Sequence, residues 1–201
     1  MDFTKPFSVS FWIKSLDGGI RGPILASRAG DKNTNFLLEI SNNKDIRVRW
    51  YNQNNNTNLR KYSVKILPVN EWVNVVVTHD GSLKSPGVKL YMDGELLEVY
   101  EISDNYRGKV PLPTELLLGK NNSGSGLMAG QLDELMFFDR ALSAKEISKL
   151  ASYNPMVELL AKNEKSESDI KRLFYHQLSH DNPQYKKMSE RLVGYKIREG
   201  R

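Results

Sequence analysis

Asp133 and Glu134 are the first residues of this chain whose types and spacing suggest acid–base chemistry. They lie in the apolar run from Leu132 to Phe138, which predicts a β-strand. A retaining glycosidase needs two carboxyl groups about 5 Å apart, and alternate positions of one strand supply that distance. Adjacent strand residues point to opposite faces instead. The two carboxylates therefore predict no glycosidase site.

Histidine and cysteine offer little further catalytic chemistry. The chain has no cysteine, which excludes disulfides, thiolate metal sites, a cysteine nucleophile and a covalently attached c-type haem. His79 lies in the segment THDGS, where nothing marks a nucleophile for Ser–His–Asp chemistry. His176 and His180 are four residues apart, but no third ligand or HExxH pattern accompanies them. These residues predict no enzyme.

Aromatic and arginine residues point to a different chemistry, the binding of an oligosaccharide or a peptide. Rings give flat platforms, and guanidinium groups give several hydrogen-bond donors. The candidate ligand-binding residues are Trp12, Arg47, Arg49, Tyr51 and Tyr91. They form one surface only if the faces of their strands coincide. The opposing interpretation makes Trp12 and Trp72 core residues and the arginines a solvated face.

Short β-strands must position these residues. From Phe7 to about Arg140, apolar and polar residues alternate in short runs separated by turn signals. Asp93 and Gly94 lie between two such runs and are typical of a type I′ hairpin turn. This pattern predicts an all-β antiparallel sandwich of the jelly-roll type. The run from Leu132 to Phe138 has apolar residues on both sides, so we expect a central strand buried on two faces.

Helical patterns replace the strand patterns towards residue 201. Ser143 and Glu146 have the spacing of a capping box, which predicts a helix start. Asn154-Pro155 marks a boundary, and Ser166 resembles a second helix start. An apolar seam of coiled-coil spacing follows at Tyr185, Met188, Leu192 and Tyr195. The sequence therefore predicts a C-terminal α-helical extension.

Composition excludes two classes of partner. The net charge is +5, but basic and acidic residues are mixed along the chain, whereas a nucleic-acid-binding protein gathers its basic residues into a stripe. No run approaches the roughly 18 apolar residues that membrane insertion needs. No signal-peptide pattern opens the chain, and this does not establish a cytoplasmic origin. We expect neither nucleic-acid binding nor membrane insertion.

Several motifs together resemble a known family. In order they are PFSVSFWIKS, ILASRAG, WVNVVVTHDGS, VKLYMDGEL and GQLDELMFFDRALSAKEI. They are similar to the concanavalin A-like, laminin-G-like jelly roll over residues 6–151. The resemblance implies a jelly-roll domain at 1–151 and a helical extension at 152–201. The extension is similar to the helical segment after such a jelly roll in large exported, planctomycete-type cytochrome c proteins.

The resemblance also carries expectations about function. Catalytic relatives have the strand motif E-x-D-x-x-E, which is absent here, so we expect no enzyme. Some relatives bind Ca²⁺ through rim oxygens, which makes Asp31, Asp80 and Asp133 the candidate metal ligands. The expected function is a non-catalytic binding or interaction module for a glycan or protein ligand. The alternative is a structural insert that docks neighbouring domains.

The extension also implies a context for the chain. Because it is similar to part of large exported proteins, we expect a piece excised from a larger extracytoplasmic protein, periplasmic or at the cell surface. Neighbouring domains of that parent protein are then expected partners.

Overall fold

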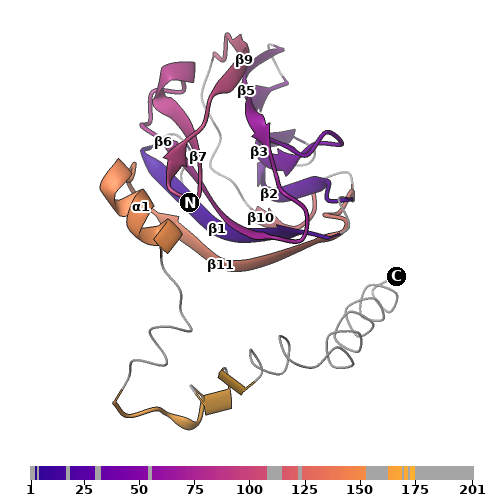
Figure 1. Ribbon diagram of the computed structural model, residues 1–201. Helices are drawn as coiled ribbons and strands as arrows, with labels where there is room; N and C mark the ends of the chain where they lie inside the picture. Colours follow the sequence, from indigo (N-terminus) through magenta and orange to yellow (C-terminus); the bar gives the residue numbers. More distant parts are fainter. Residues whose placement is uncertain are drawn as a thin grey trace. The chain divides into compact units, whose positions relative to one another are not determined.

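Strands dominate the first of the two units into which the chain divides, Met1–Ser152 and Tyr153–Arg201. The structure is a computed structural model. It describes residues 3, 5–16, 19–29, 33–53, 56–107, 115–121, 124–152, 163–168, 170–171 and 173–174. Two antiparallel sheets of the first unit form a sandwich (Figure 1), which confirms the predicted fold class.

One sheet has five strands in the order β11-β1-β6-β7-β8. Their bounds are Gly130–Phe138 for β11, Phe7–Ser15 for β1, Trp72–His79 for β6, Val88–Met92 for β7 and Glu95–Leu96 for β8. A 3₁₀ helix, η1, spans Ser85–Gly87 before β7. Asp93 and Gly94 join β7 to β8 with φ of 51° and 86°. Positive φ at both central residues is what a type I′ turn requires, so the predicted hairpin is confirmed.

The other sheet has six strands in the order β10-β2-β3-β4-β5-β9. Their bounds are Glu115–Leu118 for β10, Gly22–Ala29 for β2, Asn33–Ile40 for β3, Asp45–Asn52 for β4, Thr57–Ile66 for β5 and Val99–Asp104 for β9. Each neighbouring pair is antiparallel. The order places β4 and β5 side by side, and this pairing builds the site described below.

The core lies between the sheets and follows from strand alternation. Phe7 and Phe11 of β1 are fully buried, and the alternate residues of the strand face outwards. From the other sheet, Phe36 and Trp50 meet them, with 5.7 Å between the ring centroids of Phe7 and Phe36. Trp50 is the largest fully buried side chain. Burial of these rings contributes to the apolar stabilisation of the sandwich.

The position of β11 differs from the prediction. It is an edge strand paired only with β1, and none of its residues is fully buried. Glu134 has a φ of 48°, and the β1–β11 register shifts between Ser10 and Trp12, which marks a β-bulge. The extra residue puts Leu132 and Leu135, three positions apart, both against the core. The apolar residues on both sides had wrongly predicted a central strand.

Helix α1, Ala144–Ser152, covers part of the outer face of the five-stranded sheet. The predicted capping box is confirmed: the Ser143 amide donates to the Glu146 carboxylate at 2.9 Å, and the Glu146 amide donates back to Ser143 Oγ at 3.4 Å. Arg140 adds an ion pair of 2.6 Å, and its hydrogen bond lowers the pKa of Glu146 to about 2. Ile147 is buried against Val76 and the outward side of the sheet.

The second unit is described only in part. Residues 167–168, 170–171 and 173–174 are helical, and the Ile170 amide donates to the Ser166 carbonyl at 3.0 Å, as the predicted helix start requires. The predicted seam from Tyr185 to Tyr195 lies outside the described residues. Among the described residues, no helix has the length and hydrophobicity that crossing a membrane would require.

Candidate functional site

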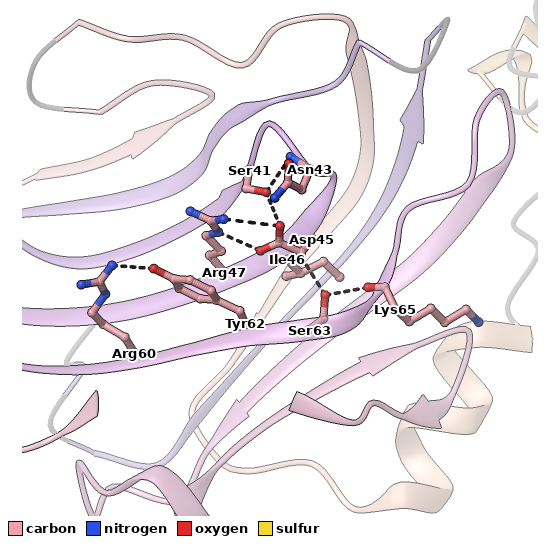
Figure 2. A network of polar contacts seen from close by, with 9 residues as sticks. All are labelled: Ser41, Asn43, Asp45, Ile46, Arg47, Arg60, Tyr62, Ser63 and Lys65. Atoms are coloured by element: carbon pink, nitrogen blue, oxygen red, sulfur yellow. Dashed lines mark hydrogen bonds and ion pairs between the residues drawn. The ribbon is translucent and has the colours of Figure 1, made fainter. Parts of the chain in front are cut away.

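Arginine and tyrosine side chains gather on the outer face of the six-stranded sheet, and Figure 2 shows Arg47, Arg60 and Tyr62 among them. We call this surface the arginine–tyrosine face. Its residues are Arg47, Arg49 and Tyr51 from β4, Arg60 and Tyr62 from β5, and Tyr100 from β9. The strand register aligns them in rows across the sheet. The surface is therefore built from residues that are far apart in the sequence.

Alternation along β4 explains why its polar side chains face outwards. Ile46, Val48 and Trp50 are fully buried in the core. The residues between them must point away from it, so Arg47 and Arg49 stand on the outer face. Arg47 and Arg49 therefore share one face of β4.

Arg60, Tyr62 and Tyr100 were not among the binding residues predicted from the sequence. On β5 the inward residues include Leu59 and Lys61, and Lys61 Nζ donates to the Val88 carbonyl at 2.8 Å. Burial lowers the pKa of Lys61. Because Lys61 is a charged residue at an inward position, the alternation of apolar and polar residues along β5 is not apparent from the sequence. Only the pairing of β5 with β4 and β9 shows that these side chains join the same face.

Arg47 is held by partners within the protein. Its Nε lies 2.7 Å from the Asp45 carboxylate, and its guanidinium carbon lies 4.2 Å from the centroid of the Tyr62 ring. The hydrogen bond to Asp45 raises the pKa of Arg47, and the charge of Glu39 acts in the same direction. Burial alone would raise the pKa of Asp45, but hydrogen bonds from Arg47 and Ser41 lower it overall. Arg47 is thus a structural arginine.

Arg49 and Arg60 have no such carboxylate. They lie directly opposite each other on β4 and β5. Among the described residues, neither forms an ion pair, and the Nε of each is hidden from solvent without an acceptor. Arg60 donates through Nη2 to the hydroxyl oxygen of Tyr62. Two half-buried cations therefore face one another across the strands.

Tyrosines border these cations. The Tyr51 hydroxyl lies 3.3 Å from Asn56 Oδ1, and Tyr51 is half-buried. Tyr100 lies opposite Tyr62 and is 60% exposed. The face can thus offer aromatic surface and guanidinium donors to one ligand.

Two of the candidate ligand-binding residues lie elsewhere. Trp12 is half-buried on the outer face of the five-stranded sheet, in register with Asn74, and its Nε1 has no acceptor among the described residues. Tyr91 is only 6% exposed because it packs beneath α1, and burial raises its pKa. The core separates both from the arginine–tyrosine face, so the five candidates do not form one surface. Trp72 is 41% exposed and is no core residue.

The two candidate calcium ligands that the structure describes, Asp80 and Asp133, lie at different places along the five-stranded sheet. Asp80 follows β6, where Oδ1 accepts the Ser82 amide at 2.8 Å. Asp133 lies on β11 and accepts the Glu134 amide at 2.8 Å. Asp31 lies outside the described residues. Within the described part of the chain, no three acidic or histidine side chains form a metal-binding group, and calcium binding through Asp31, Asp80 and Asp133 stays a prediction.

Comparison with known families gives a match to this fold. The profile of the concanavalin A-like lectin/glucanases superfamily matches residues 1–148. The chain belongs to this superfamily. The match ends before the second unit, so it does not support the resemblance of the helical extension to planctomycete-type cytochrome c proteins. A comparison with curated proteins gives no match.

Solved structures share the superfamily fold at low identity. The receptor-binding domain of a botulinum neurotoxin mosaic of serotypes C and D has a TM-score of 0.53 and 23% identity, covering 74% of this chain and 36% of that chain. The serotype D binding domain gives 0.53 and 22%, covering 74% and 37%. A Trypanosoma rangeli sialidase gives 0.53 and 15%, covering 74% and 23%. The chain thus spans well under two thirds of each, and these likenesses show the fold alone.

Proposed function

We propose that this chain is a non-catalytic binding module of the lectin type, with the arginine–tyrosine face as its oligosaccharide site. The observation that carries the proposal is the row formed by Arg47, Tyr62 and Tyr100 across three strands. It places an exposed ring beside a ring that Arg47 already holds in position. A preorganised aromatic platform reduces the entropy lost on binding.

The chemistry of the face suits a sugar ring. The apolar C–H face of a pyranose packs on a tyrosine ring, and hydroxyl oxygens accept hydrogen bonds from guanidinium groups. Arg49 and Arg60 bring donors within the same surface as Tyr62. Polar groups bordering an aromatic surface fix the orientation of a ligand.

The absence of catalysis is part of the proposal. The motif E-x-D-x-x-E does not occur in the chain. Asp133 borders the bulge of the edge strand β11 and Glu134 lies within it, on the sheet opposite the arginine–tyrosine face. A hydrolysis assay with aryl glycosides, sialosides included, should show no turnover above buffer. Turnover that Asp133→Asn abolishes would overturn this part.

We also propose that the chain is part of a larger protein and where that protein acts. Botulinum neurotoxin receptor-binding domains share this fold, and this chain covers about a third of their length, which supports a module within a larger protein. For that larger protein we also propose a location outside the cytoplasm. Immunodetection of the full-length protein in cell fractions tests this, and purely cytoplasmic signal would contradict it.

A glycan array followed by calorimetry tests the binding site. Tyr100→Ala removes an exposed ring at little cost to folding, and we expect at least a tenfold loss of affinity. Leu96→Ala is the matched control, since it truncates a side chain 59% exposed on the other sheet. Trp12→Ala tests the five-stranded face, and we expect it to keep binding. Loss in Trp12→Ala but not in Tyr100→Ala would move the site to that face.

The competing role is domain docking without a ligand. It is favoured by the exposed Phe137, 43% accessible on the edge strand β11, because an open strand edge can pair with another chain. If no glycan binds to the folded wild type, the lectin proposal fails. Phe137→Ala should then weaken association with the neighbouring domains of the parent protein.

A further inference from the structure

We infer that Arg49 and Arg60 form an oxyanion site, so that the ligand of the arginine–tyrosine face carries a sulfate or carboxylate group. The inference rests on the proposed function for the source of that group, a glycan. The site itself is argued only from the charges, the register and the unpaired donors of the face.

Two neighbouring rows of cross-strand residues differ in whether an acidic residue balances the charge of the arginine. In the first row, Glu39 lies opposite Arg47, and Arg47 lies opposite Tyr62. Asp45 completes this set with an ion pair of 2.7 Å. The positive charge of Arg47 is therefore balanced within the protein.

The second row has no acidic member. It runs Leu37, Arg49, Arg60 and Ser103 from β3 to β9. Like charges directly opposite on antiparallel strands repel each other and destabilise the pair. Half-burial strengthens this repulsion, because fewer water molecules screen it. The row thus carries two adjacent cations that the described residues leave unbalanced.

The guanidinium donors are also incompletely used. The Nε of Arg49 and the Nε of Arg60 are both without acceptors. Arg60, which lies opposite Arg49, donates a hydrogen bond through Nη2 to the Tyr62 hydroxyl. A hidden donor without an acceptor destabilises the free protein, and a small side-chain rotation towards a bound oxyanion would remove that penalty.

A bound oxyanion would remove both the repulsion between the two arginines and the lack of acceptors for their donors. Its charge cancels the repulsion, and its oxygens accept from two guanidinium edges, which favour the bidentate geometry of carboxylates and of tetrahedral oxyanions. Tyr51 and Tyr62 border the two arginines, so their rings offer a packing surface to the sugar that carries the acidic group. The geometry therefore selects an acidic glycan, a sulfated or uronic-acid oligosaccharide, over a neutral one.

The test compares three probes on the full chain. Calorimetry measures binding of a sulfated oligosaccharide, a uronic-acid oligosaccharide and a neutral oligosaccharide of equal length. Thermal unfolding in sodium sulfate, sodium phosphate and sodium chloride at equal ionic strength measures binding of the free ions. The variants are Arg49→Gln, Arg60→Gln and Arg49→Lys. Arg21→Gln is the control, because Arg21 is exposed and outside the face.

We expect the wild type to bind an acidic oligosaccharide at least tenfold more tightly than the neutral one. Arg49→Gln and Arg60→Gln should each lose at least tenfold of that preference, Arg49→Lys should lose part of it, and Arg21→Gln should keep it. Without ligand, Arg49→Gln and Arg60→Gln should melt at the same temperature as the wild type or higher, since the repulsion is gone. A lower melting temperature with unchanged binding would mean that the pair is structural, and the inference fails.

The other outcomes separate the inference from the proposed function. Equal binding of acidic and neutral oligosaccharides overturns the oxyanion site and leaves the lectin proposal standing. A third outcome is that sulfate or phosphate stabilises the wild type more than chloride does, that both glutamine variants lose this effect, and that no oligosaccharide binds. That result keeps the oxyanion site and overturns the proposal that its ligand is a glycan. If none of the probes binds or stabilises the protein selectively, both the oxyanion site and the lectin proposal fail.

Discussion

The Arg47 guanidinium carbon lies 4.2 Å from the centroid of the Tyr62 ring, and the same guanidinium is paired with Asp45 at 2.7 Å. The Arg47 side chain thereby connects the first residue of β4 with the middle of β5. Figure 2 shows the contacts of Asp45 with Ser41 and Arg47, and the hydrogen bond between Arg60 and Tyr62. The stacking of Arg47 on Tyr62 connects these two groups of contacts. The outer face of the sheet is therefore held in a fixed arrangement before any ligand arrives.

Arg47→Gln should lower the free energy of unfolding by about 1–3 kcal/mol, because it removes a charged hydrogen bond and a cation–π contact. Urea unfolding followed by tryptophan fluorescence measures the change. Arg49→Gln is the matched control, since Arg49 has no ion-pair partner among the described residues, and its effect should stay within about 0.5 kcal/mol or be stabilising. Equal losses in the two variants would contradict the distinction between a structural and an unbalanced arginine.

His79 should make stability depend on pH. Its ring is buried between Phe7 and Trp50, at centroid distances of 5.4 and 5.0 Å, and its Nε2 accepts the Leu83 amide at 3.0 Å. Burial lowers the pKa of His79 below its ordinary value of 6.5. The unfolded chain then binds a proton that the folded chain excludes, so stability is full above about pH 6.5 and is lost as the pH falls below it.

Urea unfolding at a series of pH values between 7.5 and 5 measures this loss. His79→Gln keeps a hydrogen-bond acceptor and removes the titration, so its unfolding midpoint should change less over that range. The lowered pKa values of Asp45 and Asp80 act at lower pH, where those carboxylates take up protons. An unaltered pH dependence in His79→Gln would show that another group is responsible.

Ser143→Ala should lower the free energy of unfolding by about 1 kcal/mol, because the helix loses its N-cap. The hydroxyl also donates to Glu146 at 2.7 Å, so the carboxylate loses one of its partners. Lys145→Ala, an exposed change in the same turn, is the control and should stay within about 0.5 kcal/mol. Similar losses in both would mean that the cap contributes nothing of its own.

Gly94→Ala should destabilise the hairpin beneath α1. The glycine has a φ of 86°, and an added Cβ would lie 3.2 Å from Ser148 Cα and 3.3 Å from Ala151 Cβ. We expect a loss of more than about 1 kcal/mol in thermal or urea unfolding. Gly124→Ala is a matched control, since Gly124 has a φ of 83° but no atom within 4 Å of its added Cβ. Its smaller loss isolates the contact with the helix, and equal losses would exclude that contact.

Local sequence patterns predicted most of the elements. Alternation along the strands accounts for the burial of Phe7 and Phe11 and for the outward positions of Arg47 and Arg49. The Asp93-Gly94 turn and the cap at Ser143 were predicted because each depends on residues only a few positions apart. The sequence predicted the β4 residues of the arginine–tyrosine face but not Arg60 and Tyr62. Lys61 between them is charged yet buried, so β5 shows no regular alternation of apolar and polar residues there.

The sequence by itself determined the strand alternation, the hairpin, the helix cap and the superfamily. Only the tertiary structure decided that β11 lies at an edge, that Trp12 and Arg47 stand on opposite sides of the core, and that Arg49 meets Arg60. The reason is physical. Alternation and capping arise from neighbours in the chain, whereas strand order, bulges and register arise from pairing between residues distant in sequence.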